Sequence, residues 1–229
     1  MKSLLGTLVV VALSAGSASA ATIPLQVAAS WSNAVGGTNV SYNPGAGTLD
    51  DNPLVSWGTP VTSAGKSSYR FVSTFPVEFG SAPVGPQFRV GTFTHNNRTI
   101  ALGSGIQSVQ LDLEFDFLDA STSPDAIGAM ALVFHTETPN ESAACPGDAV
   151  ACNDIVTVGN ELNVVQQFHY NGRQYQLMVL GFSVDAGLTF SNQFITQENL
   201  ANTADLYAVI TPVVPEPGTL VLLGAGLIA

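Results

Sequence analysis

The stretch Gln110-Leu111-Asp112-Leu113-Glu114-Phe115-Asp116-Phe117 alternates polar and apolar residues without a break. Successive side chains of a β-strand point to opposite faces of the sheet, so this period of two predicts a half-buried strand. The apolar residues would face a core and the acidic residues would face solvent. The stretch therefore indicates a sheet that is covered on one face.

Further short runs of β-branched and aromatic residues lie on both sides of this stretch, separated by Gly, Pro, Asn and Ser. They occupy residues 23–30, 69–75, 88–94, 130–135, 154–158, 163–170, 174–182 and 207–213. Asn171-Gly172 between two of these runs predicts a type I′ hairpin. No window shows a sustained apolar period of 3.6 residues. We therefore predict an all-β domain over residues 21–212, a β-sandwich for which a jelly roll is one arrangement.

Composition limits the classes of function. The chain has 229 residues, which suits one domain with targeting segments. Lys and Arg number 6 against 17 Asp and Glu, a formal net charge of −11, and so acidic a chain cannot neutralise many phosphates. Nucleic acid is therefore not an expected partner. Because the sequence has no nucleophile elbow, P-loop or dinucleotide motif, we expect neither an enzyme nor a bound cofactor.

Residues 1–20 have the three parts of a secretory signal peptide. Lys2 supplies the positive start, Leu4 to Ala15 form a short apolar region, and Ala18-Ser19-Ala20 is a small-residue cleavage site. The apolar region is shorter than the roughly 20 residues that a membrane-spanning helix needs. The domain is therefore expected to be exported.

The other end of the chain, residues 213–229, is equally distinctive. Val214-Pro215-Glu216-Pro217-Gly218 is followed by an apolar run that reaches Ala229. This segment resembles the PEP-CTERM sorting signal of Gram-negative bacteria. The resemblance implies processing by an exosortase-type membrane enzyme, with membrane contact only through this segment before processing. In that family an Arg-rich tail follows the apolar run, and because this sequence has none, we expect the segment to be truncated.

An internal segment, Thr94-His95-Asn96-Asn97, resembles the THxN family of PEP-CTERM proteins and the related choice-of-anchor K domain. The resemblance implies no activity for Thr94, His95 or Asn97. A histidine can act as a general base or a metal ligand, but no second ligand lies at a recognised spacing. We expect instead that these side chains tie a β-turn by hydrogen bonds to the backbone.

Asp112, Glu114 and Asp116 are the candidate metal ligands of the sequence. Same-face residues of a strand lie about 6.5–7 Å apart, too far for all three to bind one ion without help from neighbouring strands. The favoured interpretation is a solvated acidic face. A weak calcium site and a paired-carboxylate glycosidase are the alternatives.

The two cysteines, Cys145 and Cys152, lie in a Pro- and Gly-containing loop. In an exported protein such a pair predicts a disulfide.

These features predict a non-enzymatic protein of the cell surface or extracellular space of a Gram-negative bacterium. It would be sorted by an exosortase-type system and would have a structural or adhesive role beside extracellular polysaccharide in a biofilm. The acidic strand and the aromatic residues leave one alternative, an extracellular carbohydrate- or calcium-binding module.

Overall fold

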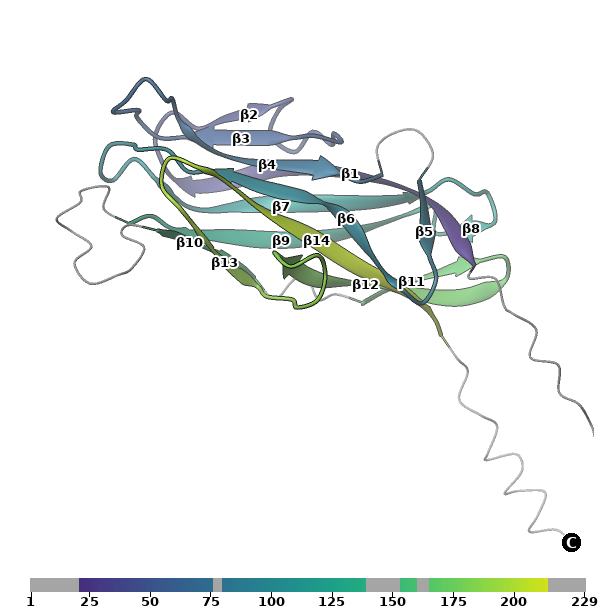
Figure 1. Ribbon diagram of the computed structural model, residues 1–229. Helices are drawn as coiled ribbons and strands as arrows, with labels where there is room; N and C mark the ends of the chain where they lie inside the picture. The colour runs from purple at the N-terminus through teal and green to yellow at the C-terminus, as the bar shows by residue number, and fades with distance from the viewer. Residues whose placement is uncertain (1–20, 76–79, 139–152, 160–164, 214–229) are drawn as a thin grey trace, which may run out of the picture.

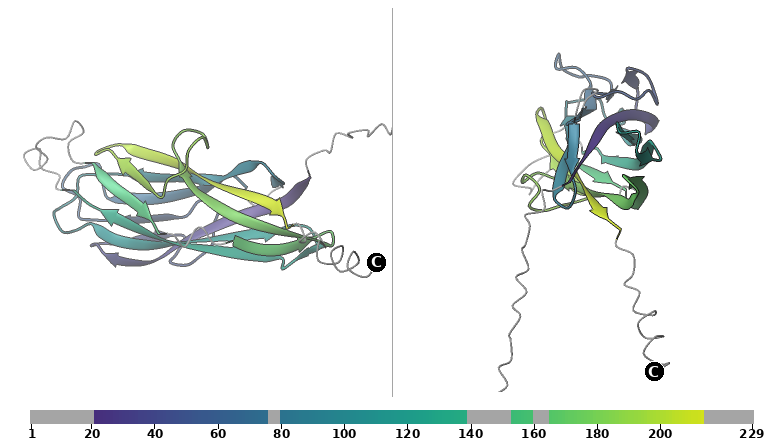
Figure 2. Two further views of the ribbon diagram at one scale, coloured as in Figure 1. Left: turned by 90° about the horizontal axis from the view of Figure 1, so that it is seen from below. Right: turned by 90° about the vertical axis from the view of Figure 1, so that its right-hand side faces the viewer.

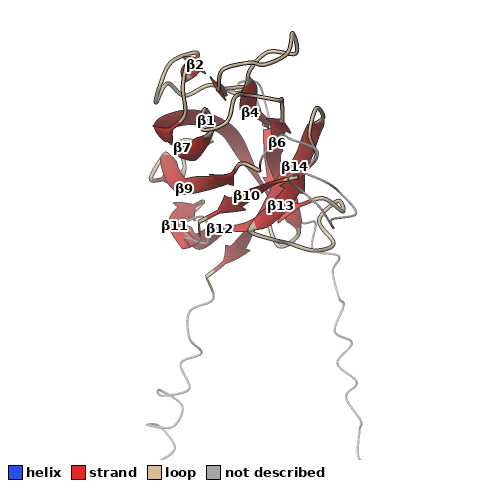
Figure 3. Cartoon of the chain, turned by 90° about the vertical axis from the view of Figure 1, so that its left-hand side faces the viewer, coloured by secondary structure: helices blue, strands red, loops and turns tan. Residues whose placement is uncertain are grey.

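The computed structural model describes residues 21–75, 80–138, 153–159 and 165–213. The predicted signal peptide, the Cys145–Cys152 disulfide and the sorting motif Val214–Gly218 lie outside the described residues. Every regular element in the described ranges is a strand, which confirms the all-β prediction (Figure 3). Among these residues we find no helix that is long and apolar enough to cross a membrane.

The strands form two antiparallel sheets that pack face to face, consistent with a β-sandwich (Figure 1, Figure 2). The bounds in chain order are β1 (Thr22–Gly36), β2 (Ser41–Asn43), β3 (Leu54–Trp57), β4 (Ser67–Ser73), β5 (Gly80–Pro83), β6 (Gln87–Asn96), β7 (Ile106–Phe117), β8 (Thr122–Ser123), β9 (Ala126–Thr136), β10 (Asp154–Val158), β11 (Val165–Tyr170), β12 (Arg173–Ser183), β13 (Gln193–Thr196) and β14 (Ala201–Pro212).

Sheet A has the strand order β13-β10-β9-β7-β1-β5, and sheet B has the order β2-β3-β4-β6-β14-β12-β11-β8. Long strands occupy the middle of each sheet, whereas the four strands at the edges are short. In the described residues the edge strands β13 and β5 have 4 residues each, β2 has 3 and β8 has 2. Most of the strands that the sequence did not predict are these short ones.

Strand β7 has the predicted alternation. Its apolar residues from Leu111 to Phe117 are buried against sheet B, and its acidic residues are half-buried on the outer face. Large side chains from both sheets fill the space between the layers, among them Trp31 of β1, Tyr69 of β4 and Phe93 of β6. Burial of these apolar surfaces is the main force that holds the two sheets together.

Two local features fix the register of sheet B. Asn171 and Gly172 have φ angles of 51° and 71°, which confirms the predicted type I′ hairpin between β11 and β12. Strand β6 bulges at Val90, because Leu206 of β14 pairs with Gly91 and the next residue of β14 pairs with Arg89. A Cβ on Gly91 would lie 2.7 Å from the backbone oxygen of Val72, so only glycine fits at this bulge.

The chain enters and leaves the sandwich at one pole, which we call the terminal pole (Figure 1). The turn at Val84 and Gly85 bonds to both ends of the domain there. Val84 N donates to Ala21 O at 2.8 Å, and Gly85 N donates to Ile210 O at 2.8 Å. Because β6 and β14 are antiparallel, the Asn96 end of β6 lies at the opposite pole. We call that end, where β6, β9 and β13 finish and β10 begins, the distal pole.

Candidate metal centre

Three strands place a potential metal ligand on their core face at the distal pole. In β6 the inward positions run through Phe93 to His95, and in β9 they run through Val133 to His135. Asp154 opens β10 on the same face as the buried valines of that strand. The period of two therefore directs these polar side chains into the interior rather than toward water.

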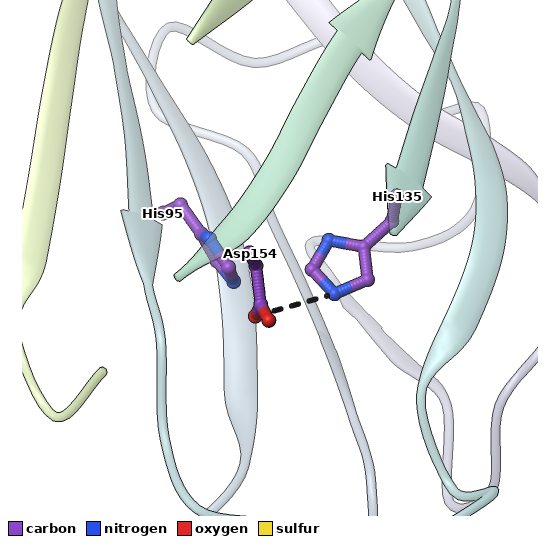
Figure 4. Close-up of side chains that lie close together, drawn as sticks. All are labelled: His95, His135 and Asp154. Carbon is purple, nitrogen blue, oxygen red and sulfur yellow. Dashed lines mark ion pairs between the residues drawn. The ribbon is translucent and has the colours of Figure 1, made fainter. Parts of the chain in front are cut away.

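The three side chains converge between the sheets (Figure 4). One ligand atom from each of His95, His135 and Asp154 lies within 4.8 Å of the others. His95 belongs to sheet B, whereas the other two belong to sheet A. The relative exposures are 0%, 6% and 0%, so the cluster spans the two sheets and is closed to bulk water.

The hydrogen bonds around His95 determine its tautomer. Its Nδ1 lies 2.9 Å from Oγ1 of Thr196, and that hydroxyl donates to the backbone oxygen of Asp154 at 3.4 Å. When the Thr196 hydroxyl donates to Asp154 in this way, Nδ1–H of His95 is the donor to Thr196. Nε2 of His95 is then a bare lone pair, buried and without a hydrogen-bond partner.

The charge state of His95 agrees with this assignment. Burial holds its pKa well below the usual value, and the neighbouring His135 lowers the pKa further. A neutral imidazole with one nitrogen held by a hydrogen bond and the other bare is the form that binds a metal ion.

Both ring nitrogens of His135 have partners. Its Nδ1 lies 2.6 Å from the Tyr69 hydroxyl, and its Nε2 lies 3.0 Å from Oε2 of Glu137 and 3.6 Å from Oδ2 of Asp154. A tyrosine hydroxyl can donate or accept, so Tyr69 accommodates either tautomer of the imidazole. The pKa of Tyr69 lies well above the usual value, because of burial first and then Asp154 and Glu137, so the hydroxyl keeps its proton.

Asp154 has one satisfied and one unsatisfied oxygen. Its Oδ1 accepts from the backbone N and the hydroxyl of Thr138 at 2.9 and 3.2 Å, whereas Oδ2 is buried without a hydrogen-bond partner. Burial, followed by repulsion from Glu137, raises the pKa of Asp154 to about 6. A buried carboxylate oxygen without a partner is costly, and a bound cation would offset that cost.

Glu198 extends the cluster on the side of the turn between β13 and β14. Ligand atoms of Glu137, Asp154 and Glu198 also lie within 4.8 Å of one another. Both carboxylate oxygens of Glu198 are buried and lack a hydrogen bond of good geometry, although the Asn97 side chain and the Asn199 backbone lie close enough to lower its pKa. Burial raises the pKa of Glu198 to about 7, and repulsion from the other two carboxylates adds to this effect.

Aromatic rings form the inner wall of the site. The ring of Trp57 stacks on His95 with centroids 5.8 Å apart and an interplanar angle of 20°. Tyr69 meets the same imidazole edge-on at 4.9 Å, and the imidazoles of His95 and His135 lie 5.1 Å apart. This apolar wall keeps water away, so the charges inside interact more strongly than they would at the surface.

The THxN-like segment, which the sequence analysis singled out, does not form the expected turn. Thr94 and His95 lie in β6 and Asn97 follows directly, so the expected β-turn is wrong. Thr94 points to the outer face, whereas Asn97 is buried and its Nδ2 donates to the backbone oxygen of Thr196 at 3.4 Å. The THxN-like segment thus extends a strand and supplies His95 and Asn97 to the buried cluster.

Asp112, Glu114 and Asp116 lie on the outer face of β7, away from this cluster. Asp112 accepts hydrogen bonds from Ser32 at 3.3 Å and from Gln110 at 2.7 Å. Neither of the ligand groups found among the described residues includes any of the three carboxylates. Their placement agrees with a solvated acidic face.

Sequence reasoning missed His135, Asp154, Glu137 and Glu198. A signal for the first two was present, because the alternation of Val133 with its neighbours places His135 inward and the same period in β10 places Asp154 inward. Glu137 and Glu198 follow strand ends and had no such signal.

No protein-family model matches the chain, and no curated protein is similar to it in sequence.

Proposed function

We propose that this chain is a non-enzymatic, exported protein of the cell surface or extracellular matrix whose β-sandwich holds a divalent transition-metal ion between its sheets. The observation that carries the proposal is the bare, buried Nε2 of His95, which faces His135 and Asp154 of the opposite sheet. Two imidazoles with a carboxylate suit zinc and its first-row neighbours better than calcium, which prefers an all-oxygen set.

The position of the cluster favours a structural role for the ion over a catalytic one. His95 and Asp154 are fully buried, so a substrate would have no direct access to an ion held between them. An ion bound by His95 of sheet B and by His135 and Asp154 of sheet A would join the two sheets. It would act at the distal pole as a cross-link within the sandwich.

The layout of the domain supports an anchored protein. Residues 21 and 213 both lie at the terminal pole, next to the predicted signal peptide and the PEP-CTERM-like segment. Attachment through that segment would hold the distal pole, with its metal ion, away from the membrane. His95 and Asn97 of the THxN-like segment lie at the site, which gives that motif a physical role as part of the metal-binding cluster.

This proposal keeps the exosortase-type enzyme as the processing partner and extracellular polysaccharide as the surroundings. The carbohydrate-binding alternative gains no support from the largest aromatic side chains. Trp31 and Trp57 are 1% and 0% exposed in the core, where they cannot stack on a sugar.

Thermal unfolding tests the metal proposal. We expect Zn²⁺ at 100 times its dissociation constant to stabilise the metal-free protein by about 2.7 kcal/mol. For a domain of this size that corresponds to a rise in Tm of about 5–11 °C. His95→Ala should abolish the rise, whereas His169→Ala, at an exposed position of β11, should retain it. An equal rise in both variants would contradict the assignment.

Fractionation of the host cells tests the proposed export. Recovery of the mature protein from the cytosol would contradict it.

A further inference from the structure

We propose that the distal pole binds a second divalent cation, of the hard, oxygen-preferring class, beside the transition-metal ion. Its ligands would be the carboxylates of Glu137, Asp154 and Glu198, with Asp154 shared between the two ions. This inference rests on the proposed function, because it takes the first ion to be held by His95, His135 and Asp154.

The geometry for a shared ligand is present. Asp154 belongs to both ligand groups, and within each group the ligand atoms lie within 4.8 Å of one another. Oδ1 of Asp154 is occupied by Thr138, so the free Oδ2 would contact both cations through its two lone pairs. Neighbouring metal ions in two-metal sites lie about 3.5–4 Å apart, a spacing that a cluster of this size allows.

Burial distinguishes this cluster from an ordinary acidic patch. Asp154 is 0% exposed and its Oδ2 has no hydrogen-bond partner. Both oxygens of Glu198 are buried and lack a hydrogen bond of good geometry. Exposed carboxylates are solvated by water, but these oxygens are not, so they need a cation or protons in place of water.

The donor chemistry of this group differs from that of the first site. Because the donors on this side are all carboxylate oxygens, the site suits Ca²⁺ or Mn²⁺ rather than a second soft ion.

A sequential titration tests the inference. The metal-free protein is first loaded with one equivalent of Zn²⁺, which outcompetes Mn²⁺ at a site that contains imidazoles. Mn²⁺ is then added as the probe, and free Mn²⁺ is measured by electron paramagnetic resonance. We expect the wild type to bind one Zn²⁺ and then one Mn²⁺ per chain.

Glu198→Gln is the decisive variant, because Glu198 belongs only to the carboxylate group. We expect it to bind Zn²⁺ with an affinity within a few-fold of the wild type and to bind Mn²⁺ at least tenfold more weakly. Glu114→Gln, at a half-buried position on the outer face of β7, is the matched control and should bind both ions.

The outcomes separate the two proposals. If the wild type takes up one Zn²⁺ but no Mn²⁺, or if Glu198→Gln binds Mn²⁺ as well as the wild type does, the second site is refuted and the first stands. If the wild type takes up no Zn²⁺, the proposed function fails and the second site fails with it.

Discussion

Replacing Thr196 by Val tests whether the hydroxyl of this residue sets the tautomer of His95. Val keeps the β-branched shape that suits the last position of β13, so the backbone should not move. The change removes the acceptor that lies 2.9 Å from Nδ1 of His95. The imidazole then has either a buried Nδ1–H without a partner or a proton on Nε2, the atom that the metal ion needs.

Both effects have a size that follows from these contacts. Leaving one buried donor without a partner costs about 1–3 kcal/mol, so we expect metal-free Thr196→Val to be destabilised by that amount. For a domain of this size the loss lowers Tm by about 2–12 °C. Loss of a hydrogen bond to a metal-ligating histidine weakens binding by about 10–100-fold, which is about 1.4–2.7 kcal/mol.

The assays are thermal unfolding in the presence of a chelator and a Zn²⁺ titration against a chromophoric competitor. Thr211→Val is the control, because Thr211 lies at the terminal pole and its hydroxyl accepts only from Gln176 at 3.1 Å. We expect it to change stability by less than about 0.5 kcal/mol. If Thr196→Val matches this control in both assays, the hydrogen-bonded chain from His95 to Asp154 does not prepare the site, and the reasoning is refuted.

Three further predictions follow from the same structure. Folding raises the pKa of Glu198 from 4.5 to about 7, so this group stabilises the metal-free fold at low pH and loses that contribution as pH rises through about 7. Tm should therefore fall between about pH 4.5 and pH 7, and an equal fall in Glu198→Gln would contradict this cause. Tyr69→Phe should weaken Zn²⁺ binding about 10–100-fold, measured by the same competition, because His135 loses its partner 2.6 Å away. Gly91→Ala should cost about 1–3 kcal/mol in chemical denaturation because its Cβ would meet a backbone oxygen at 2.7 Å, whereas Gly128→Ala, whose Cβ has only an ordinary contact at 3.7 Å, should cost less.

The period of two was enough to predict the long strands and their buried faces. The alternation in β7 and the Asn171-Gly172 turn depend on residues that are neighbours in the chain, and both predictions are confirmed. The prediction of a turn at His95 was wrong because it ignored pairing with strands that are distant in the chain. Asn96 and Asn97 are typical turn residues, but Asn96 pairs with Ser68 on one side and with Ala201 on the other, so the strand continues through Asn96.

The candidate metal centre could not be predicted from the sequence alone. His95 and His135 are 40 positions apart in the numbering and belong to different sheets, so their approach depends on how the sheets stack. Spacing motifs find ligands that one helix or one loop brings together, and no local spacing joins these residues. The usable signal was a polar residue at an inward position of an otherwise apolar strand, as His135 is after Val133.

The short edge strands have a consequence for the behaviour of the domain at high concentration. An exposed edge presents unpaired N–H and C=O groups, and a long, flat edge invites another copy to add its own strand and start a fibril. The terminal strands, of 2–4 residues each, offer few such groups in a row. At these four strands, neighbouring copies of the domain at high density therefore have little backbone with which to build a continuous intermolecular sheet.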